Sequence, residues 1–371
     1  HLGRNTREVL KSIDMLVIDE ISMVSADLLD AMNRMLIAAR GKGRGPFGGV
    51  QVVMFGDPYQ LAPVMPQDPT ERAWLAENYQ SNWFFDAHVW RDATLERYEL
   101  SEIFRQHDEE FKEILNAIRD GSCTQEMLDR INKAGNRYAK SDDVIRLCTV
   151  NRTVDSVNST RLAKLTTTPK EFKGQFVSGD LQSFGRSLPV DTNLVLKVGA
   201  QVMFVKNDDQ SNQKTKEGRV LKRWVNGTIG KVTEVINPKH VVVEVDGEEI
   251  DVTTSSWEKV RYEIEEDFDE ATQKFREIVV PVTLAEYEQI PLRLAWAVTV
   301  HKSQGQTYEE VIVDMGAGAF SPGQTYVALS RVRSLEGLFL TRAITLRDIQ
   351  VDQDVIRFMN SRGNAGLNRL I

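Results

Sequence analysis

Residues 15–20 read Met15-Leu16-Val17-Ile18-Asp19-Glu20, an apolar run that ends in two carboxylates. Apolar residues then recur at helical spacing between positions 28 and 36, and a second apolar run, Val50 to Phe55, ends in Gly56-Asp57. Two strand-like runs joined by a helix and a loop indicate a parallel sheet. In such sheets the chemistry collects at the carboxyl ends of the strands. We therefore expect an α/β fold with Asp19, Glu20 and Asp57 at one functional edge.

Length and composition limit the class of protein. The chain has 371 residues, of which 41% are hydrophobic, enough for about two or three domains with apolar cores. No apolar run approaches the ~20 residues that span a membrane, and the first residues show no signal or transit peptide pattern. Two cysteines are too few for a disulfide framework. The net charge of −8 argues against a general polyanion coat, although a basic groove can lie in an acidic protein.

The hydrophobic pattern of the sequence changes near residue 190, where short runs typical of β-strands follow one another. Asp246-Gly247 separates two of them and is typical of a two-residue hairpin turn. This pattern predicts a small β-barrel or sandwich between α/β segments. The acidic run 263–270 is expected to be a solvated stretch, and 294–300 a continuous buried strand. The runs are Leu194–Val205, Thr228–Ile236, Val241–Val245 and Glu249–Val252.

The acidic pair Asp19-Glu20 and the amide side chain of Gln60 suit phosphate chemistry. A strand that ends in Asp-Glu is how many NTPases hold Mg²⁺ and activate a water molecule. Gln60, in the loop after the second strand, can bond a γ-phosphate or orient water. A surface loop explains Asp19-Glu20 about as well, and an Asp-Pro turn explains the residues around Gln60.

Basic residues supply further candidates. Arg105 and Arg331 are candidate arginine fingers, because a planar guanidinium can meet two oxygens of a transferring phosphoryl group. An ordinary salt-bridged arginine is the alternative for each. The stretch 301–305, His-Lys-Ser-Gln-Gly, follows an apolar strand and offers compact donors for phosphates of a nucleotide or a nucleic acid.

A phosphate-binding P-loop is missing from the sequence. The motif G-x-x-x-x-G-K-[ST] occurs nowhere in the 371 residues, and the glycine-rich stretch 41–49 does not match it. We interpret this stretch as a mobile connection that touches nucleic acid.

Six motifs together resemble superfamily-one DNA helicases of the PIF and RecD type. The resemblance covers about residues 10 to 342, and the last two motifs are specific to that group. In chain order they are VIDEISM (17–23), GDPYQLAPV (56–64), LSEIFRQ (100–106), LCTVNRTVDSVN (147–158), LAWAVTVHKSQGQT (294–307) and GQTYVALSRVRS (323–334).

The resemblance implies two RecA-like P-loop NTPase domains, with ATP between them and single-stranded DNA across both. It also implies a small SH3-like β-barrel inserted in the second domain. The implied boundaries are 1–98 for the last part of the first RecA-like domain, 99–190 and 288–371 for the second, and 191–287 for the insert.

The resemblance also implies roles for individual residues. Asp19 would ligate Mg²⁺, Glu20 would be the catalytic base, and Gln60 would sense the γ-phosphate. Arg105 and Arg331 would be fingers from the second domain. The other implied nucleotide contacts are Phe104 and Gly305, and the implied DNA contacts are Asn151, Thr299, His301, Lys302 and Ser303.

The main departure from this family is the missing Walker A segment. We expect a helicase fragment that is inactive by itself, with a missing N-terminal segment or a neighbouring chain against its first domain. Intact, it would be an ATP-dependent 5′-to-3′ helicase acting on single-stranded and forked DNA in repair or recombination. It would be cytoplasmic or nucleoid-associated, or nuclear or mitochondrial in a eukaryote. The alternative is a non-hydrolysing pseudo-helicase that binds single-stranded DNA or a partner.

Overall fold

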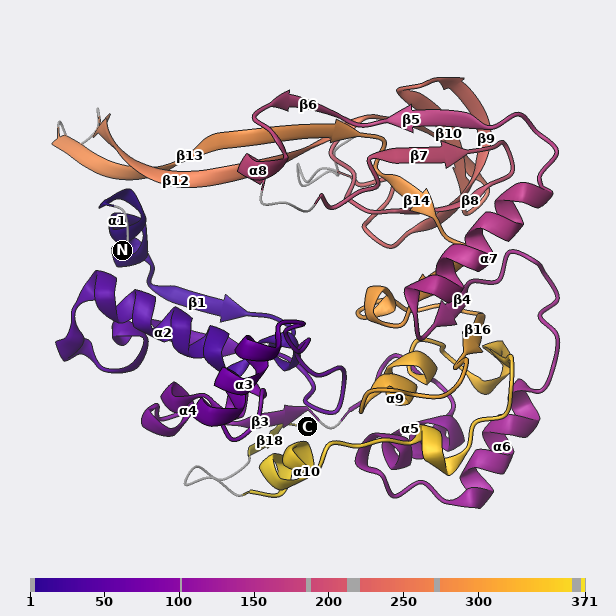
Figure 1. The fold of residues 1–371 in the computed structure, drawn as a ribbon, viewed down its shortest axis with the longest axis horizontal. Helices are drawn as coiled ribbons and strands as arrows, with labels where there is room; N and C mark the ends of the chain where they lie inside the picture. The colour runs from indigo at the N-terminus through magenta and orange to yellow at the C-terminus, as the bar shows by residue number, and fades with distance from the viewer. Residues whose placement is uncertain are drawn as a thin grey trace.

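The computed structural model describes residues 4–100, 102–184, 188–211, 221–269, 274–361 and 368–370. Helices and strands of the N-terminal third lie on one side, and a second α/β region lies beside them (Figure 1). Antiparallel strands from the middle of the chain extend across both (Figure 1). None of the described helices is long and apolar enough to cross a membrane.

The N-terminal region contains the predicted parallel strand pair. β1 (Met15–Ile18) pairs in parallel with β2 (Gln51–Met54), and α2 (Ala26–Arg40) connects them. Leu29 and Leu36 of α2 are buried, as the helical spacing of the apolar residues predicts. Among the described strands, β1 is the only partner of β2, and Phe55 just beyond β2 is 55% exposed. The other elements of this region are α1 (Arg4–Ser12), α3 (Pro69–Asn78), α4 (His88–Asp92) and β3 (Tyr98–Leu100).

The second half of the glycine-rich connection between α2 and β2 packs on α2, whereas Gly41, Gly43 and Gly45 are exposed and have open space around them. The mobility expected of this connection stays a prediction. Phe47 is buried, and its backbone N–H donates to Asn33 Oδ1 of α2. Arg40 Nε donates to the carbonyl of Gly48. A side chain at Gly48 would lie 2.8 Å from the Leu36 carbonyl oxygen, so the loop approaches α2 as closely as only glycine allows.

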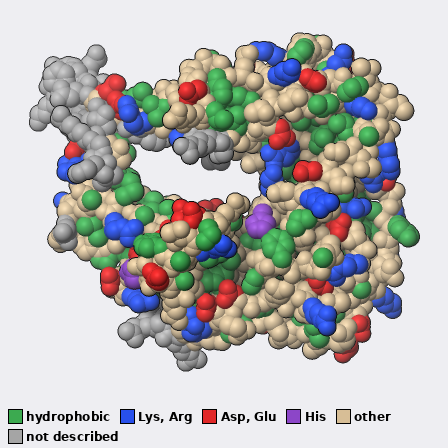
Figure 2. All heavy atoms as spheres, in the orientation of Figure 1, with side chains coloured by type: hydrophobic (Ala, Val, Ile, Leu, Met, Phe, Trp, Pro, Cys, Tyr) green, Lys and Arg blue, Asp and Glu red, His purple; other side chains and the backbone are tan. Residues whose placement is uncertain are grey.

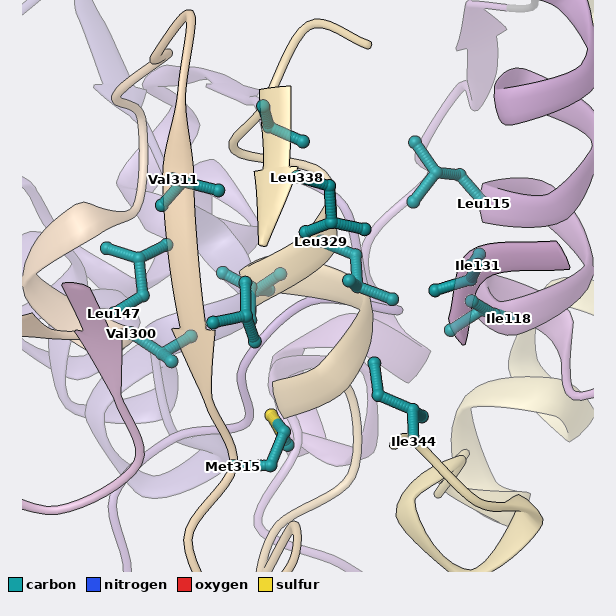
Figure 3. Close-up of a cluster of buried hydrophobic side chains, with 14 of the residues drawn as sticks. Leu115, Ile118, Ile131, Leu147, Val300, Val311, Met315, Leu329, Leu338 and Ile344 are labelled. Carbon is teal, nitrogen blue, oxygen red and sulfur yellow. The ribbon is translucent and has the colours of Figure 1, made fainter. Parts of the chain in front are cut away.

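The second α/β region is built on a four-stranded parallel sheet in the order β15-β4-β16-β17. Aliphatic side chains from this sheet and from the helices beside it form one buried cluster (Figure 3). The strands are β4 (Arg146–Cys148), β15 (Ala297–Thr299), β16 (Val311–Asp314) and β17 (Leu338–Leu340); the helices are α5 (Glu109–Asp120), α6 (Gln125–Gly135), α7 (Asn151–Lys164) and α9 (Gln324–Leu329).

The stretch 294–300 is not one strand. β14 (Leu292–Leu294) pairs with β8 (Gln201–Phe204) in the antiparallel sheet, whereas β15 belongs to the parallel sheet. Asn158 of α7 holds the start of β15, since its side chain accepts from the Ala297 N–H and donates to the Ala297 carbonyl. The continuous apolar run therefore crosses from one sheet to the other, which apolar character alone does not reveal.

The middle of the chain forms antiparallel sheets. Five strands lie in the order β11-β10-β9-β8-β14, and Asp246 and Gly247 form the predicted hairpin turn, both with positive φ. The run 194–205 is divided into β7 and β8 by a turn at Gly199. The strands are β5 (Lys170–Lys173), β6 (Gln175–Ser178), β7 (Asn193–Leu196), β9 (Ile229–Asn237), β10 (His240–Val245) and β11 (Glu248–Thr253), with helix α8 (Leu181–Phe184).

A long hairpin extends from these sheets. β12 (Ser255–Asp269) pairs with β13 (Lys274–Gln289) along its whole length. The acidic run was expected to be a solvated stretch, yet its described part, residues 263–269, belongs to β12; Glu270 lies outside the described residues. Its backbone groups are paired across the hairpin, and side chains such as Glu265 stay exposed on it.

The C-terminal segment returns to the N-terminal region. In α10 (Gln353–Asn360), Phe358 stacks on Phe85 at 4.2 Å between ring centroids, and Arg97 lies over the Phe358 ring. Trp83 Nε1 donates to Asp352, and β18 (Asn368–Leu370) pairs in parallel with β3. The two α/β regions are therefore joined both by the chain near residue 105 and by this returning segment (Figure 1).

Candidate nucleotide and nucleic-acid site

Asp19 and Glu20 stand at the carboxyl end of β1, where the parallel pair β1–β2 predicts them. Glu20 has a left-handed backbone (φ 49°, ψ 47°), and its N–H donates to Asp19 Oδ1 at 2.8 Å. A non-glycine residue in this conformation is uncommon and is often found at functional sites. Glu20 Oε2 accepts a hydrogen bond at 3.0 Å from Gln304 Nε2 of the second region. The carboxyl end of β1 thus faces the second α/β region directly.

Asp57, at the end of β2, also contacts the second region. Its carboxylate accepts from Arg119 Nη2 of α5 and from the Tyr326 hydroxyl of α9, both at 3.2 Å. Burial and the nearby Asp57 charge raise the pKa of Tyr326, so this hydroxyl keeps its proton and acts as the donor. Burial opposes the charge of Arg119, but Asp57 raises its pKa overall.

Gln60 lies in the same loop as Asp57, against the start of α9. Gly323 has a φ of 75°, and a side chain there would lie 2.4 Å from the Gln60 carbonyl oxygen. The loop 57–60 is therefore held in place by contacts from the second region at both ends. It presents the half-buried Gln60 between the two regions.

Arg331 is almost fully buried, with 1% of its surface exposed. Its guanidinium donates to three neutral acceptors: Val327 O at 3.0 Å, Gln306 O at 3.3 Å and Ser330 Oγ at 2.8 Å. None of the carboxylates that the structure describes forms an ion pair with it. Burial, and next the neighbouring Arg105, lower the pKa of Arg331 to about 10, although Glu20 acts in the opposite direction. A charged group is thus buried among neutral acceptors.

The two other candidates for the nucleotide lie at this junction or beside it. Arg105 is half-buried, and its Nη1 donates to the Ser330 carbonyl at 3.4 Å, next to Arg331. Gly305 has a φ of 78°, and a side chain there would meet no atom within 4 Å. Phe104 is 77% exposed and packs on nothing that would fix its ring.

The candidate DNA positions group at the carboxyl end of β15. Asn151, Thr299 and Lys302 line a cleft of about 640 Å³, together with Arg293. A wide opening passes between the N-terminal region and the antiparallel strands, with basic side chains on its border (Figure 2). His301 is half-buried, and burial lowers its pKa. Ser303 is fully buried and its hydroxyl donates to Val300 O, so its side chain faces the protein.

Sequence reasoning missed three residues at this junction. Gln304 lies in the stretch 301–305 that was expected to contact phosphates, but its contact with Glu20 was not expected. Tyr326 lies in the same motif as Arg331, four residues after Pro322, and its neighbours in the sequence do not indicate Asp57 as its partner. Arg119 is the penultimate residue of an amphipathic helix, and nothing local marks it as a partner of Asp57.

Comparisons with known proteins bear on this arrangement. A family model described as PIF1-like helicase matches residues 1–129. The ATP-dependent DNA helicase Pif1 of Bdellovibrio bacteriovorus is 30% identical over 351 residues, covering 94% of this chain and 70% of that protein. The chain belongs to the PIF1-like helicase family. This confirms the resemblance to PIF-type helicases, and the relatives compared are named as ATP-dependent DNA helicases.

Other relatives agree with this assignment. Human ATP-dependent DNA helicase PIF1 is 33% identical over 339 residues, which cover 87% of this chain but 45% of that protein. The chain also resembles a crystal structure of a Bacteroides Pif1 helicase in complex with ADP-AlF3 and single-stranded DNA. That match has a TM-score of 0.70 and 32% identity, and covers 98% of this chain and 78% of the other. The α/β fold with added antiparallel sheets is thus that of Pif1 helicase structures.

Proposed function

We propose that this chain carries most of the motor of an ATP-dependent 5′-to-3′ DNA helicase that moves along single-stranded DNA. The observation that carries the proposal is Arg331, a buried guanidinium with only neutral hydrogen-bond acceptors among the described residues. A buried charge without a counter-ion destabilises the folded protein. Its presence therefore indicates a role that needs the charge. A bound phosphate group would supply this negative charge. Arg105 and Glu20 both lie close enough to affect the pKa of Arg331, so the phosphate would bind beside all three residues.

The residues at the junction suit phosphoryl transfer to water. Glu20 takes a proton from the attacking water, and Gln60 bonds the γ-phosphate. Arg105 and Arg331 neutralise charge on the equatorial phosphate oxygens as it develops. Because the carboxylate comes from the N-terminal region and the arginines from the second, the complete set exists only when the two regions are close.

Asp19 fits the single protein ligand that Mg²⁺ needs beside a nucleotide. Its carboxylate is exposed at the strand end, and Mg²⁺ is commonly held by one or two carboxylates together with phosphate oxygens. When bound, the ion neutralises phosphate charge. The described residues contain no group of three or more metal-binding side chains, as suits an ion that arrives with its nucleotide.

We infer that the strand of DNA lies along the opening between the regions. Asn151, Thr299, His301 and Lys302 offer it contacts from the second region. The antiparallel sheets between residues 191 and 287 are proposed as the SH3-like insert, and the α/β segments 1–98, 99–190 and 288–371 as parts of two RecA-like domains. Forked duplex DNA is the proposed substrate for unwinding.

The alternative is a non-hydrolysing protein that binds single-stranded DNA or a partner. It is favoured by one observation: the 371 residues contain no G-x-x-x-x-G-K-[ST] motif. A binding protein, however, needs neither a buried arginine without a described carboxylate partner nor an acidic residue close enough to affect its pKa.

Phosphate release by the full-length protein separates these functions. We expect hydrolysis of Mg·ATP that single-stranded oligothymidylate stimulates and that Arg331→Ala removes, at about the 10³–10⁵-fold worth of an arginine finger. Strand binding without any hydrolysis would favour the alternative. Parental turnover in Arg331→Ala would show that this arginine is structural.

A further inference from the structure

Gln304 connects the candidate strand-binding turn to the candidate base. Its side-chain N–H donates at 3.0 Å to Glu20 Oε2, across the boundary between the two α/β regions. The two residues are 284 positions apart in the chain, so this contact exists only in the folded arrangement. Among the described residues, Gln304 is also the one whose side chain donates to the Glu20 carboxylate.

The amide oxygen of Gln304 is buried and has no hydrogen-bond partner in the described part of the chain. Leaving such an oxygen unpaired destabilises the folded state. Because most buried polar groups are paired, those that are not call for an explanation such as a role in catalysis. An apolar side chain at this position would leave no polar atom unpaired. The function of the amide is therefore the hydrogen bond that its N–H donates to Glu20.

The segment around Gln304 is short and internally bonded. On one side, Thr299 Oγ1 accepts from the Lys302 N–H at 3.3 Å, and the Ser303 hydroxyl donates to Val300 O at 2.8 Å. On the other side, the Gln306 carbonyl accepts from Arg331 Nη1. One rigid turn therefore presents strand contacts at its start, the Glu20 partner in its middle and an Arg331 partner at its end.

The antiparallel insert holds the far end of this turn. Gln306 Nε2 donates to the Asn226 carbonyl at 3.3 Å, and a side chain at Gly227 would lie 2.2 Å from Gln306 Oε1. With one end packed in this way, a movement imposed on residues 301–303 by a bound strand is passed to Gln304 rather than absorbed by the loop.

We propose that Gln304 is a positioning residue that makes ATP hydrolysis depend on the bound strand. Its amide sets the orientation of the Glu20 carboxylate, and the strand sets the position of the amide through the turn 299–304. The proposal rests on the proposed function, since it needs Glu20 to act as the base. It adds no chemical step and assigns Gln304 no contact with nucleotide or DNA.

Three variants of the full-length protein test this role. Gln304→Ala removes the donor, and Gln304→Glu keeps the size but replaces the donor with a second carboxylate. Gln125→Ala is the control, because it removes an exposed amide of α6 that bonds only Asp129 among the described residues and lies outside the turn 299–306. The measurements are kcat and KM for ATP with and without oligothymidylate, and the Kd for a fluorescent oligothymidylate.

In Gln304→Ala we expect the stimulation ratio, the rate with the strand over the rate without it, to fall by at least about fivefold, the lower end of ordinary coupling between sites. The KM for ATP and the Kd for the strand should stay within about twofold, because Gln304 contacts neither ligand. Gln304→Glu should be at least as impaired as the alanine variant, and the control Gln125→Ala should keep the parental ratio.

Two results would overturn the proposal while leaving the proposed function intact. Parental stimulation in Gln304→Ala would show that the contact carries no coupling. Recovery in Gln304→Glu would show that only the size of the side chain matters. A parent protein with no strand-stimulated hydrolysis would overturn the proposed function itself, and the coupling with it.

Discussion

Replacing Arg331 with methionine removes a buried charge while keeping a long, flexible side chain that can fill the space. Burial and Arg105 lower the pKa of Arg331 from 12.5 to about 10, so the folded state disfavours the charged form by about 3 kcal/mol. The substitution relieves this cost. It also removes three hydrogen bonds from a charged donor to neutral acceptors, worth about 1.5–3 kcal/mol each.

The two contributions oppose each other, so we expect Arg331→Met to lower the free energy of unfolding by less than the loss of an ion-paired buried arginine would. Arg342→Met is the matched control. Arg342 pairs at 2.7 Å with Asp348, whose side chain is 4% exposed, and chiefly this pairing holds the pKa of Asp348 well below its usual range. Removing Arg342 leaves a buried carboxylate without its cation, which typically costs about 3–5 kcal/mol.

Urea unfolding followed by circular dichroism compares the two variants with the parent at neutral pH. We predict a smaller shift of the midpoint for Arg331→Met than for Arg342→Met. A loss in Arg331→Met as large as that in Arg342→Met would contradict this prediction, because it would identify Arg331 as a structural arginine rather than one held ready for an anion.

Glu20→Gln should keep Mg·ATP and strand binding but lose turnover, because the amide has the shape of the base without its basicity; nucleotide binding and phosphate release on one preparation test this. Tyr326→Phe should lower the free energy of unfolding by about 1–2 kcal/mol, since Asp57 keeps Arg119 but loses one donor; an unchanged urea midpoint would contradict it. Strand binding should weaken with salt at a log–log slope of about −0.7 per phosphate contacted, and an affinity flat from low to moderate salt would count against contacts to the DNA backbone. The 371 residues by themselves should show no strand-stimulated phosphate release, since Asp19 and Glu20 then have no anchored phosphates to act on.

Local patterns were sufficient for the elements whose identity depends on nearby residues. The strand before Asp19, the helix with Leu29 and Leu36, and the turn at Asp246-Gly247 all follow from periodicity and turn chemistry. Where strand identity depends on the partner, the same reasoning failed. The run 294–300 is almost entirely apolar, yet it divides between two sheets. Its first residue, Leu294, belongs to β14, which pairs with β8, whereas β15 pairs with β4.

The contacts that join the two regions could not be predicted from the sequence. Glu20 and Gln304, or Asp57 and Tyr326, lie far apart in the chain and carry no local signal of pairing. The acidic residues 263–269 were expected to be a solvated stretch, and Glu265 is indeed exposed. Their pairing with β13 could not be predicted, because the acidic run itself does not indicate a partner strand. Motif recognition found the residue types of the site, whereas the structure supplied their partners.

Unwinding by the full-length protein, with ATP and Mg²⁺ present, tests the central claim most directly. The substrates are two duplexes of equal length, one with a 5′ single-stranded tail and one with a 3′ tail, and Glu20→Gln serves as the control. The account predicts that the parent unwinds the 5′-tailed duplex, leaves the 3′-tailed duplex paired, and loses this activity in Glu20→Gln. Unwinding of the 3′-tailed duplex alone, or unwinding by Glu20→Gln at the parental rate, would contradict it.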